Sequence, residues 1–223
     1  MKVVVVMARA LDAPADTIKT RLSPVLPDAG DRHALHAACV ADVVDVARKV
    51  PGTLLRVAAT CDGTGESFRA VGVEPGHVFH QQGDDVAARE RAIFERMFRQ
   101  GASHVVLVGS DIPLLTPDVL AEAFDALTAD PLRVVLGPAA DGGYYLLGLT
   151  GPVVPDLFSG VRWSTVYTLA DTLRRCEFEN RRVAFLPVLE DVDTPEALER
   201  LRATLRAEPT RAPHTANWLD VDA

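Results

Sequence analysis

Short apolar runs rich in β-branched residues alternate along this chain with longer segments of helical periodicity. This alternation is typical of an α/β protein, in which helices pack on the faces of a sheet. The predicted strands cover residues 2–8, 53–60, 77–80, 104–108, 132–136, 144–149 and 182–188. The predicted helices cover residues 30–50, 66–71, 84–100 with Asp84 as cap, 116–129, 163–176 and 194–206.

The link between the fifth and sixth predicted strands constrains the sheet further. Residues 137–143 are too few for a parallel crossover, which needs about a dozen residues or more. If the two strands are neighbours, they therefore run antiparallel. The sequence predicts a mixed sheet rather than a wholly parallel one.

The length of 223 residues allows one large domain or two small ones. Residues 1–207 of the 223 contain no linker and no internal repeat, so we predict a single domain there. Residues 208–223 contain two prolines and little periodicity, and we expect them to form a loose C-terminal tail.

Charge and cysteine content exclude several classes of function. The net charge of −8 argues against a nucleic-acid partner, because surfaces that bind nucleic acid are usually basic. The three cysteines lie far apart without metal-ligand spacing, which favours reduced thiols and a cytoplasmic location. The apolar runs are too short for a membrane span. None of these features predicts the oligomeric state.

A carboxylate follows the fourth predicted strand. Residues 104–108 are followed by Gly109, Ser110 and Asp111, and Pro113 then prevents further strand pairing. Open α/β sheets bind ligands beyond the carboxyl ends of their strands, which is where Asp111 is expected. The alternative is that Asp111 only caps a turn.

Cationic side chains follow the first strand. Residues 9–27 form a long irregular segment that contains Arg9, Lys19, Thr20 and Arg21. Arginine and lysine suit phosphate groups, so this segment is a candidate phosphate-binding loop. A solvated loop with scattered charges is the alternative.

Two further acidic residues precede the last predicted helix. Asp191 and Asp193, together with Asp111, are candidates for holding Mg²⁺ or Mn²⁺, which prefer carboxylate oxygens. The alternative is that they cap the helix that begins near Thr194. Capping accounts for one acidic residue more easily than for two.

The short link between the fifth and sixth strands contains Asp141, Gly142 and Gly143, followed by Tyr144. The glycines suit a tight hairpin. They would also let the backbone approach a ligand closely while Asp141 binds hydroxyl groups.

The stretch Trp163, Ser164 and Thr165 suits stacking on a base or sugar, or packing in the core. Phosphate-binding fingerprints of the P-loop or dinucleotide type are absent after the first strand. Ser110 has no evident histidine partner, so a hydrolase triad is disfavoured.

Five stretches together resemble a known family. In chain order they are residues 19–22, 109–115, 137–145, 163–165 and 191–195. They look like a bacterial glycosyltransferase family of the nucleotide-diphospho-sugar transferase (GT-A) fold, the radical-SAM/selenodomain-associated transferases, formerly a domain of unknown function. That family is similar in fold to the 2-phospholactate and molybdenum-cofactor guanylyltransferases. The resemblance covers about residues 1–200.

The resemblance implies a three-layer, Rossmann-like α/β fold with a mostly parallel sheet of about seven strands and one antiparallel strand. It also implies that Asp111 and Asp193 hold Mg²⁺ or Mn²⁺, with Asp191 as the alternate ligand. Asp111, Asp141 and Lys19 are the expected catalytic residues. Substrate contacts are expected from Arg9, Lys19, Thr20, Arg21, Gly109, Ser110, Gly142, Gly143, Tyr144, Trp163, Ser164 and Thr165.

We therefore expect a Mg²⁺- or Mn²⁺-dependent transferase with a nucleotide-sugar donor and an unknown small-molecule acceptor. The first alternative is a nucleotidylyltransferase that uses a nucleoside triphosphate and a phosphorylated acceptor. The second is a degenerate, non-enzymatic nucleotide-binding or interaction protein. Relatives usually carry a Pro-Gly loop before Lys19, whereas residues 11–18 contain two aspartates and no glycine. This departure favours the second alternative.

Overall fold

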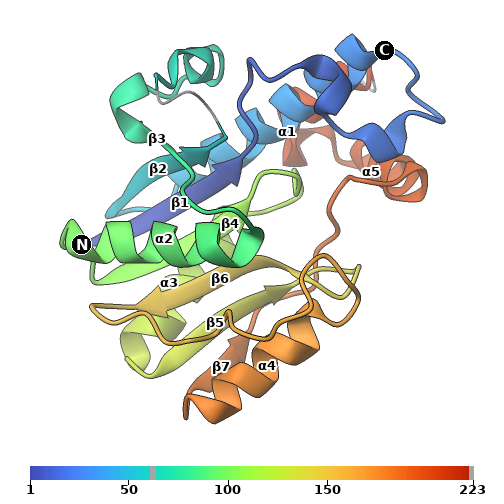
Figure 1. The fold of residues 1–223 in the computed structure, drawn as a ribbon. Coiled ribbons are helices and arrows are strands. Elements are labelled where there is room, and N and C mark those ends of the chain that lie inside the picture. The colour runs from blue at the N-terminus through green and yellow to red at the C-terminus, as the bar shows by residue number, and fades with distance from the viewer. Residues whose placement is uncertain (61–63, 221–223) are drawn as a thin grey trace.

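The computed structural model describes residues 1–60 and 64–220 (Figure 1). Within these residues one sheet has seven strands in the order β3-β2-β1-β4-β6-β5-β7. The strands are β1 (Lys2–Ala8), β2 (Thr53–Ala59), β3 (Val78–His80), β4 (His104–Gly109), β5 (Arg133–Pro138), β6 (Tyr144–Thr150) and β7 (Arg182–Phe185). Every predicted strand is present. β7 ends earlier than predicted, because Pro187 has no N–H group with which to continue the pairing.

β6 is the antiparallel strand of the sheet. It runs antiparallel to β4 on one side and to β5 on the other, whereas all the other neighbours are parallel. The direction predicted from the short link at residues 137–143 is confirmed. Because of this reversal, β6 begins at the edge of the sheet where β4 and β5 end, and Tyr144 lies at that edge.

Four of the six described α-helices lie close to their predicted positions. The six are α1 (Ala29–Arg48), α2 (Val86–Arg99), α3 (Pro117–Ala129), α4 (Thr168–Phe178), α5 (Pro195–Ala207) and α6 (Pro213–Trp218). Of these, α4 begins later than predicted and α6 was not predicted. The hydroxyls of Thr116 and Thr194 cap α3 and α5, as their sequence positions predict. Asp85 caps α2 instead of the predicted Asp84, because its carboxylate accepts the Ala88 N–H. None of the described helices is long and apolar enough to span a membrane.

Short 3-10 helices complete the described secondary structure. They are η1 (Ala15–Thr17), η2 (Thr20–Leu22), η3 (Glu66–Val71), η4 (Pro75–His77) and η5 (Pro209–Arg211). The first two lie in the segment after β1, which the sequence analysis treats as irregular, and they fold it into two tight turns. The predicted short helix at residues 66–71 is confirmed as η3.

α4 begins at Thr168, later than the predicted start at residue 163. Ser164 has a φ of 57°, in the left-handed region, which a right-handed helix does not accommodate. The Thr165 hydroxyl donates to the Arg162 carbonyl and accepts from the Tyr167 N–H. Residues 163–165 therefore form a turn ahead of the helix.

The sheet is buried on both faces, which gives the predicted three-layer α/β fold. In β1, Val4 and Val6 pack with α1 and α3, whereas Val3 and Val5 pack with α2 on the opposite face. Figure 1 shows α2 and α4 on one face of the sheet. Each valine is at most 1% exposed. Burial of one such side chain contributes about 1.5–3 kcal/mol, so this packing holds the strand ends in place.

The expectation of a loose tail is wrong for residues 208–220. The backbone N–H groups of His214 and Thr215 and the Thr215 hydroxyl all donate to the buried carboxylate of Asp42 on α1. Asp42 thereby caps α6 from another helix, while Ala212 and Ala216 are fully buried. The local sequence of α6 lacks a cap of its own, so periodicity alone gave no sign of the helix.

Candidate active site

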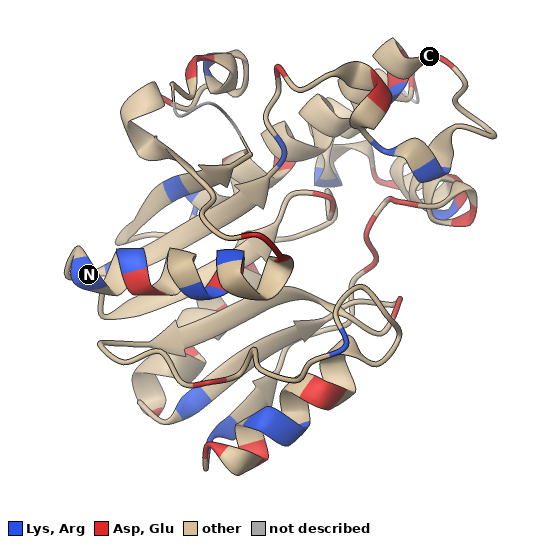
Figure 2. Cartoon of the chain, viewed as in Figure 1, with Lys and Arg blue, Asp and Glu red and all other residues tan. Residues whose placement is uncertain are grey.

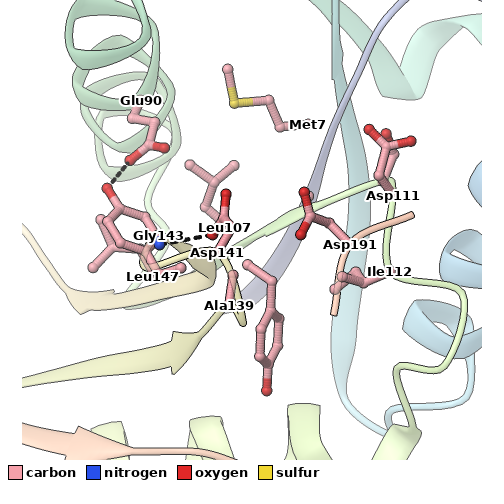
Figure 3. Close-up of a pocket in the computed structure, with 14 residues that line it drawn as sticks. Met7, Glu90, Leu107, Asp111, Ile112, Ala139, Asp141, Gly143, Leu147 and Asp191 are labelled. Carbon is pink, nitrogen blue, oxygen red and sulfur yellow. Dashed lines mark hydrogen bonds between the residues drawn. The ribbon is translucent and has the colours of Figure 1, made fainter. Parts of the chain in front are cut away.

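Three carboxylates from distant segments meet at the edge where the parallel strands end. Asp111 follows β4, Asp141 lies in the β5–β6 hairpin, and Asp191 lies between β7 and α5. Figure 3 shows them around a common space. The Val192 N–H donates to the Asp111 carbonyl at 2.9 Å, which holds the segment after β7 against the end of β4. The topology therefore collects carboxylates at the edge where such sheets bind ligands.

Lys19 lies between two of the expected metal ligands. Its Nζ atom donates to Asp111 Oδ1 at 2.6 Å and to the Val192 carbonyl at 2.8 Å, and it is 3.5 Å from Asp193 Oδ1. The Lys19 side chain is only 3% exposed. Burial lowers the pKa of Lys19, but the charges around it, Asp111 first among them, together with the Asp111 hydrogen bond outweigh burial, so the pKa is raised and the ammonium stays charged.

His36 on α1 also faces Asp111. Its Nδ1 atom is 3.7 Å from Asp111 Oδ1, and its Nε2 atom is 3.3 Å from the Arg9 carbonyl. Burial raises the pKa of Asp111, but the nearby Lys19 ammonium and the His36 imidazole together outweigh burial and hold the pKa well below its usual range. Asp111 is therefore an anion at neutral pH. The sequence analysis missed His36, although its place beside Leu35 on the buried side of α1 is a usable signal.

Asp191 and Asp193 are less well compensated. Burial, together with the negative charges of Asp193 and Asp141, raises the pKa of Asp191 to about 6. Burial and the Asp111 charge likewise raise the pKa of Asp193. These shifts show a concentration of negative charge that a bound cation would relieve.

The donor chemistry of this edge fits a divalent cation. Carboxylate oxygens from Asp111, Asp191 and Asp193 are the ligands that Mg²⁺ and Mn²⁺ prefer. Among the described residues no three such side chains converge as a preformed metal site. The Lys19 ammonium instead bridges Asp111 and Asp193, so a divalent cation has to compete with it.

The cationic pocket, as we call the larger of two adjoining cavities, has a volume of about 370 Å³. The structure brings together there most of the residues predicted to hold phosphates and metal. Figure 2 shows acidic residues on the loops at this edge and basic residues on the segment after β1. Its lining comprises Arg9, Thr17, Ile18, Lys19, Thr20, Arg21, His36, Asp111, Asp141, Ser164, Asp191 and Asp193.

The second cavity, which we call the tyrosine pocket, has a volume of about 230 Å³ and adjoins the first across Asp111, Asp141 and Asp191 (Figure 3). Its wall is largely apolar. The remaining lining residues are Met7, Glu90, Leu107, Gly109, Ser110, Ile112, Ala139, Gly143, Tyr144, Tyr145 and Leu147. Nine of the twelve predicted substrate-binding residues divide between these two cavities, and Gly142 is among the three that line neither.

The β5–β6 hairpin fixes Asp141 between the two pockets. The Gly143 N–H donates to Asp141 Oδ1 at 2.8 Å. Gly142 has a φ of 90°, and a Cβ atom there would lie 2.4 Å from the Val166 carbonyl oxygen. Only glycine fits this conformation and this close approach. The hairpin interpretation of the glycines is confirmed, and the same turn orients Asp141.

Glu90 on α2 is a pocket residue that the sequence analysis missed. It is 7% exposed, and one of its carboxylate oxygens accepts a hydrogen bond from the Tyr144 hydroxyl at 2.7 Å. Burial raises the pKa of Glu90 to about 7, against a smaller lowering effect of the Tyr144 hydrogen bond. Glu90 precedes Ile93 and Phe94 by three and four residues, so a charged residue within the buried stripe of α2 was the available signal.

Trp163 lies behind Tyr144 rather than against the carboxylates. The two rings meet edge to face with centroids 6.2 Å apart, and Trp163 also stacks on Phe158. Trp163 lines a separate cavity beside α2. Neither Trp163 nor Thr165 lines the cationic or the tyrosine pocket, whereas Ser164 lines the cationic pocket.

Residues 43–165 match a family model described as "Uncharacterized protein conserved in bacteria" (DUF2064). This match spans more than half of the 223 residues. The chain belongs to the DUF2064 family. No curated protein matches this DUF2064 chain in sequence.

Solved structures share the fold. A candidate nucleotide-diphospho-sugar transferase from Desulfovibrio desulfuricans G20 is 26% identical, with a TM-score of 0.88 over 98% of this chain and 94% of that one. CMP:2-keto-3-deoxy-manno-octonic acid synthetase, solved with CTP, is 17% identical, with a TM-score of 0.60 over 93% and 99% of the two chains. A cytidylyltransferase from Leptospira borgpetersenii serovar Hardjo-bovis is 13% identical, with a TM-score of 0.55 over 95% and 96%. The expected nucleotide-diphospho-sugar transferase (GT-A) fold is confirmed.

Proposed function

We propose that this DUF2064 chain is a transferase that uses a nucleotide-diphospho-sugar donor and transfers the sugar to a small-molecule acceptor. The observation that carries the proposal is the pair of adjoining pockets, which share Asp111, Asp141 and Asp191 but differ in the chemistry of their walls. One wall suits phosphates and the other suits a small organic molecule. The similarity to the Desulfovibrio protein supports this assignment.

The cationic pocket would bind the diphosphate of the donor. In the described part of the chain, the guanidinium groups of Arg9 and Arg21 have no hydrogen-bond or ion-pair partner, so both are available to phosphate oxygens. Arginine offers phosphate a planar, two-pronged contact. Lys19 adds a buried positive charge beside them.

A cavity of about 430 Å³ at the ends of β1 and β2 continues from Arg9 and Asp111 and suits the nucleoside of the donor. The Gln81 side-chain amide lines it and donates to the carbonyls of Ala8 and Ala58, which fixes the amide between the two strands. The nucleotide would thus lie across the first strands, as the family resemblance implies.

Mg²⁺ or Mn²⁺ would be held by Asp111 and Asp193, with Asp191 as the alternate ligand. When bound, the cation would stabilise the negative charge that develops on the leaving diphosphate. Arg9, Lys19 and Arg21 would stabilise the same charge through fixed hydrogen-bond donors. Asp141, held by the Gly143 N–H, would orient the attacking group of an acceptor in the tyrosine pocket.

A nucleotidylyltransferase is the second candidate, because CMP:2-keto-3-deoxy-manno-octonic acid synthetase binds CTP on the same fold. Both candidates would use the cationic pocket, and they differ in the donor. A ligand that binds only the folded protein raises its melting temperature by mass action. In a thermal-shift panel of nucleoside triphosphates and UDP- or GDP-sugars, each with Mn²⁺, the donor should therefore be the compound that raises the melting temperature most.

The same panel tests the metal assignment with Asp111→Asn. We expect a nucleotide sugar with Mn²⁺ to raise the melting temperature of the wild type and to leave the melting temperature of Asp111→Asn unchanged. Asp125→Asn, an exposed acid on α3, is the matched control and should respond like the wild type. Stabilisation by triphosphates alone would favour the second candidate. Equal stabilisation of the wild type and Asp111→Asn would overturn the role of Asp111.

A further inference from the structure

The tyrosine pocket is acidic although most of its wall is apolar. Four of its lining residues are acidic, namely Glu90, Asp111, Asp141 and Asp191, and none of its described lining residues is lysine, arginine or histidine. Such a wall repels anions, including a phosphorylated acceptor, and attracts cations. The cationic pocket, which contains Arg9, Lys19 and Arg21, has the opposite preference.

Glu90 places one of these negative charges at the far end of the pocket. Figure 3 shows Glu90 at the end of the pocket away from Asp111, and Tyr144 is hydrogen-bonded to it. Tyr144 occupies one Glu90 oxygen, and within the described residues the other oxygen has no hydrogen-bond partner and Glu90 has no ion pair. A buried carboxylate without a counter-ion is costly, because burial removes its hydration without replacing it.

The neighbouring pocket shows how this chain compensates a buried carboxylate. There the Lys19 ammonium donates to Asp111 and to the Val192 carbonyl. In the tyrosine pocket no described lining residue supplies the corresponding cation, and the cavity beside Glu90 is large enough for a ligand to supply it.

We propose that the tyrosine pocket binds an acceptor that carries a primary ammonium group on a ring-sized apolar body, with the ammonium against Glu90. The role as acceptor rests on the proposed transferase function, but the preference for an ammonium group follows from the pocket itself. The apolar body would contact Met7, Leu107 and Leu147, and the Tyr144 and Tyr145 rings would add favourable cation–π contacts. Glu90 then determines specificity for the acceptor.

Three probes of similar size test the charge preference in the wild type: benzylamine, benzyl alcohol and benzoate. Titrations followed by the NMR signal of the Met7 methyl group report binding in this pocket. We expect benzylamine to bind at least about tenfold more tightly than benzyl alcohol, and benzoate not to bind. Benzoate binding as tightly as benzylamine would overturn the proposal, and this comparison needs no variant.

Glu90→Gln tests the residue. We expect it to reduce benzylamine affinity by about tenfold or more and to leave benzyl alcohol affinity unchanged. Glu95→Gln, on the same helix, is the matched control and should bind benzylamine like the wild type. Undiminished benzylamine affinity in folded Glu90→Gln would overturn the assignment of Glu90.

Donor binding separates this inference from the proposed function. Glu90 lies outside the cationic pocket, so Glu90→Gln should keep the thermal shift produced by the nucleotide sugar. If no nucleotide stabilises the wild type, the transferase proposal fails while the ammonium preference can still be measured. If the nucleotide sugar binds but benzylamine does not, the ammonium inference alone fails.

Discussion

The cationic pocket and the tyrosine pocket share three carboxylates but compensate their charge differently. In the cationic pocket the protein supplies the counter-ion, because Lys19 lies against Asp111 and Asp193. In the tyrosine pocket the Tyr144 phenol is the only hydrogen-bond partner of the buried Glu90 among the described residues. With the two proposed ligands bound, the shared carboxylates would lie between ligands of opposite charge.

The two walls also come from different parts of the fold. The segment after β1 and the residues after β7 build most of the cationic wall, whereas α2, β6 and the ends of β1 and β4 build most of the tyrosine wall. The β5–β6 hairpin contributes Asp141 to both. Since the walls have separate origins, substitutions can alter one pocket and leave the other intact. Three substitutions should show this separation.

Lys19→Met should have the largest effect on stability. It removes the buried counter-ion of Asp111 and Asp193, and breaking a buried ion pair costs about 3–5 kcal/mol. Because Asp111 is 36% exposed, we expect a loss near the lower limit of that range, about 3 kcal/mol, in urea unfolding at pH 7. Lys49→Met, at an exposed lysine, is the control. A loss below about 1 kcal/mol would show that the pair contributes little.

Glu90→Gln should change the pH dependence of stability. The pKa of Glu90 is about 7 in the folded protein against an ordinary 4.5, so the folded state binds a proton more tightly. The free energy of unfolding therefore contains the full contribution of protonated Glu90 below pH 4.5. This contribution is lost as the pH rises towards 7, and the loss is at most about 3 kcal/mol. Urea unfolding at pH 5 and pH 8 should show a smaller decrease for Glu90→Gln than for the wild type. Identical decreases would contradict the raised pKa.

Gly142→Ala should disturb the hairpin that carries Asp141, which lines both pockets. The new Cβ atom would overlap the Val166 backbone at a positive φ, which we expect to cost about 2 kcal/mol and to displace Asp141. Benzylamine binding should weaken more than the nucleotide-sugar thermal shift, because the proposed phosphate-binding side chains Arg9, Lys19 and Arg21 lie outside the hairpin. Gly76→Ala, where a Cβ meets nothing within 4 Å, is the control. Equal loss of both ligands would show that the two walls are not independent.

The sequence predicted the elements of the fold because each had a local signal. The shortness of residues 137–143 was enough to predict the direction of β6, and Thr116 and Thr194 marked two helix starts. The helix α6 was not predicted, because its capping residue, Asp42, lies on α1. A cap donated by a distant residue leaves no pattern in the local sequence.

The candidate site was predicted as a set of residues but not as an arrangement. Asp111, Lys19 and Arg21 were expected at one edge, and they line one pocket. The position of Lys19 between Asp111 and Asp193 depends on how three segments pack, which spacing does not report. Glu90 was missed for the same reason, since only the start of β6 brings Tyr144 to it.

Because β6 runs antiparallel to β5, only the short loop at residues 139–143 joins the two strands. Its ends are fixed by strand pairing, and the Ala140 N–H donates to the Leu189 carbonyl, so the scaffold holds the hairpin from both sides. Sequence change at Ala139 or Ala140 could therefore reshape the proposed acceptor pocket without rebuilding β1 or β4, whereas Gly142 has to remain glycine. A lineage could diversify acceptors through one short loop while keeping its donor.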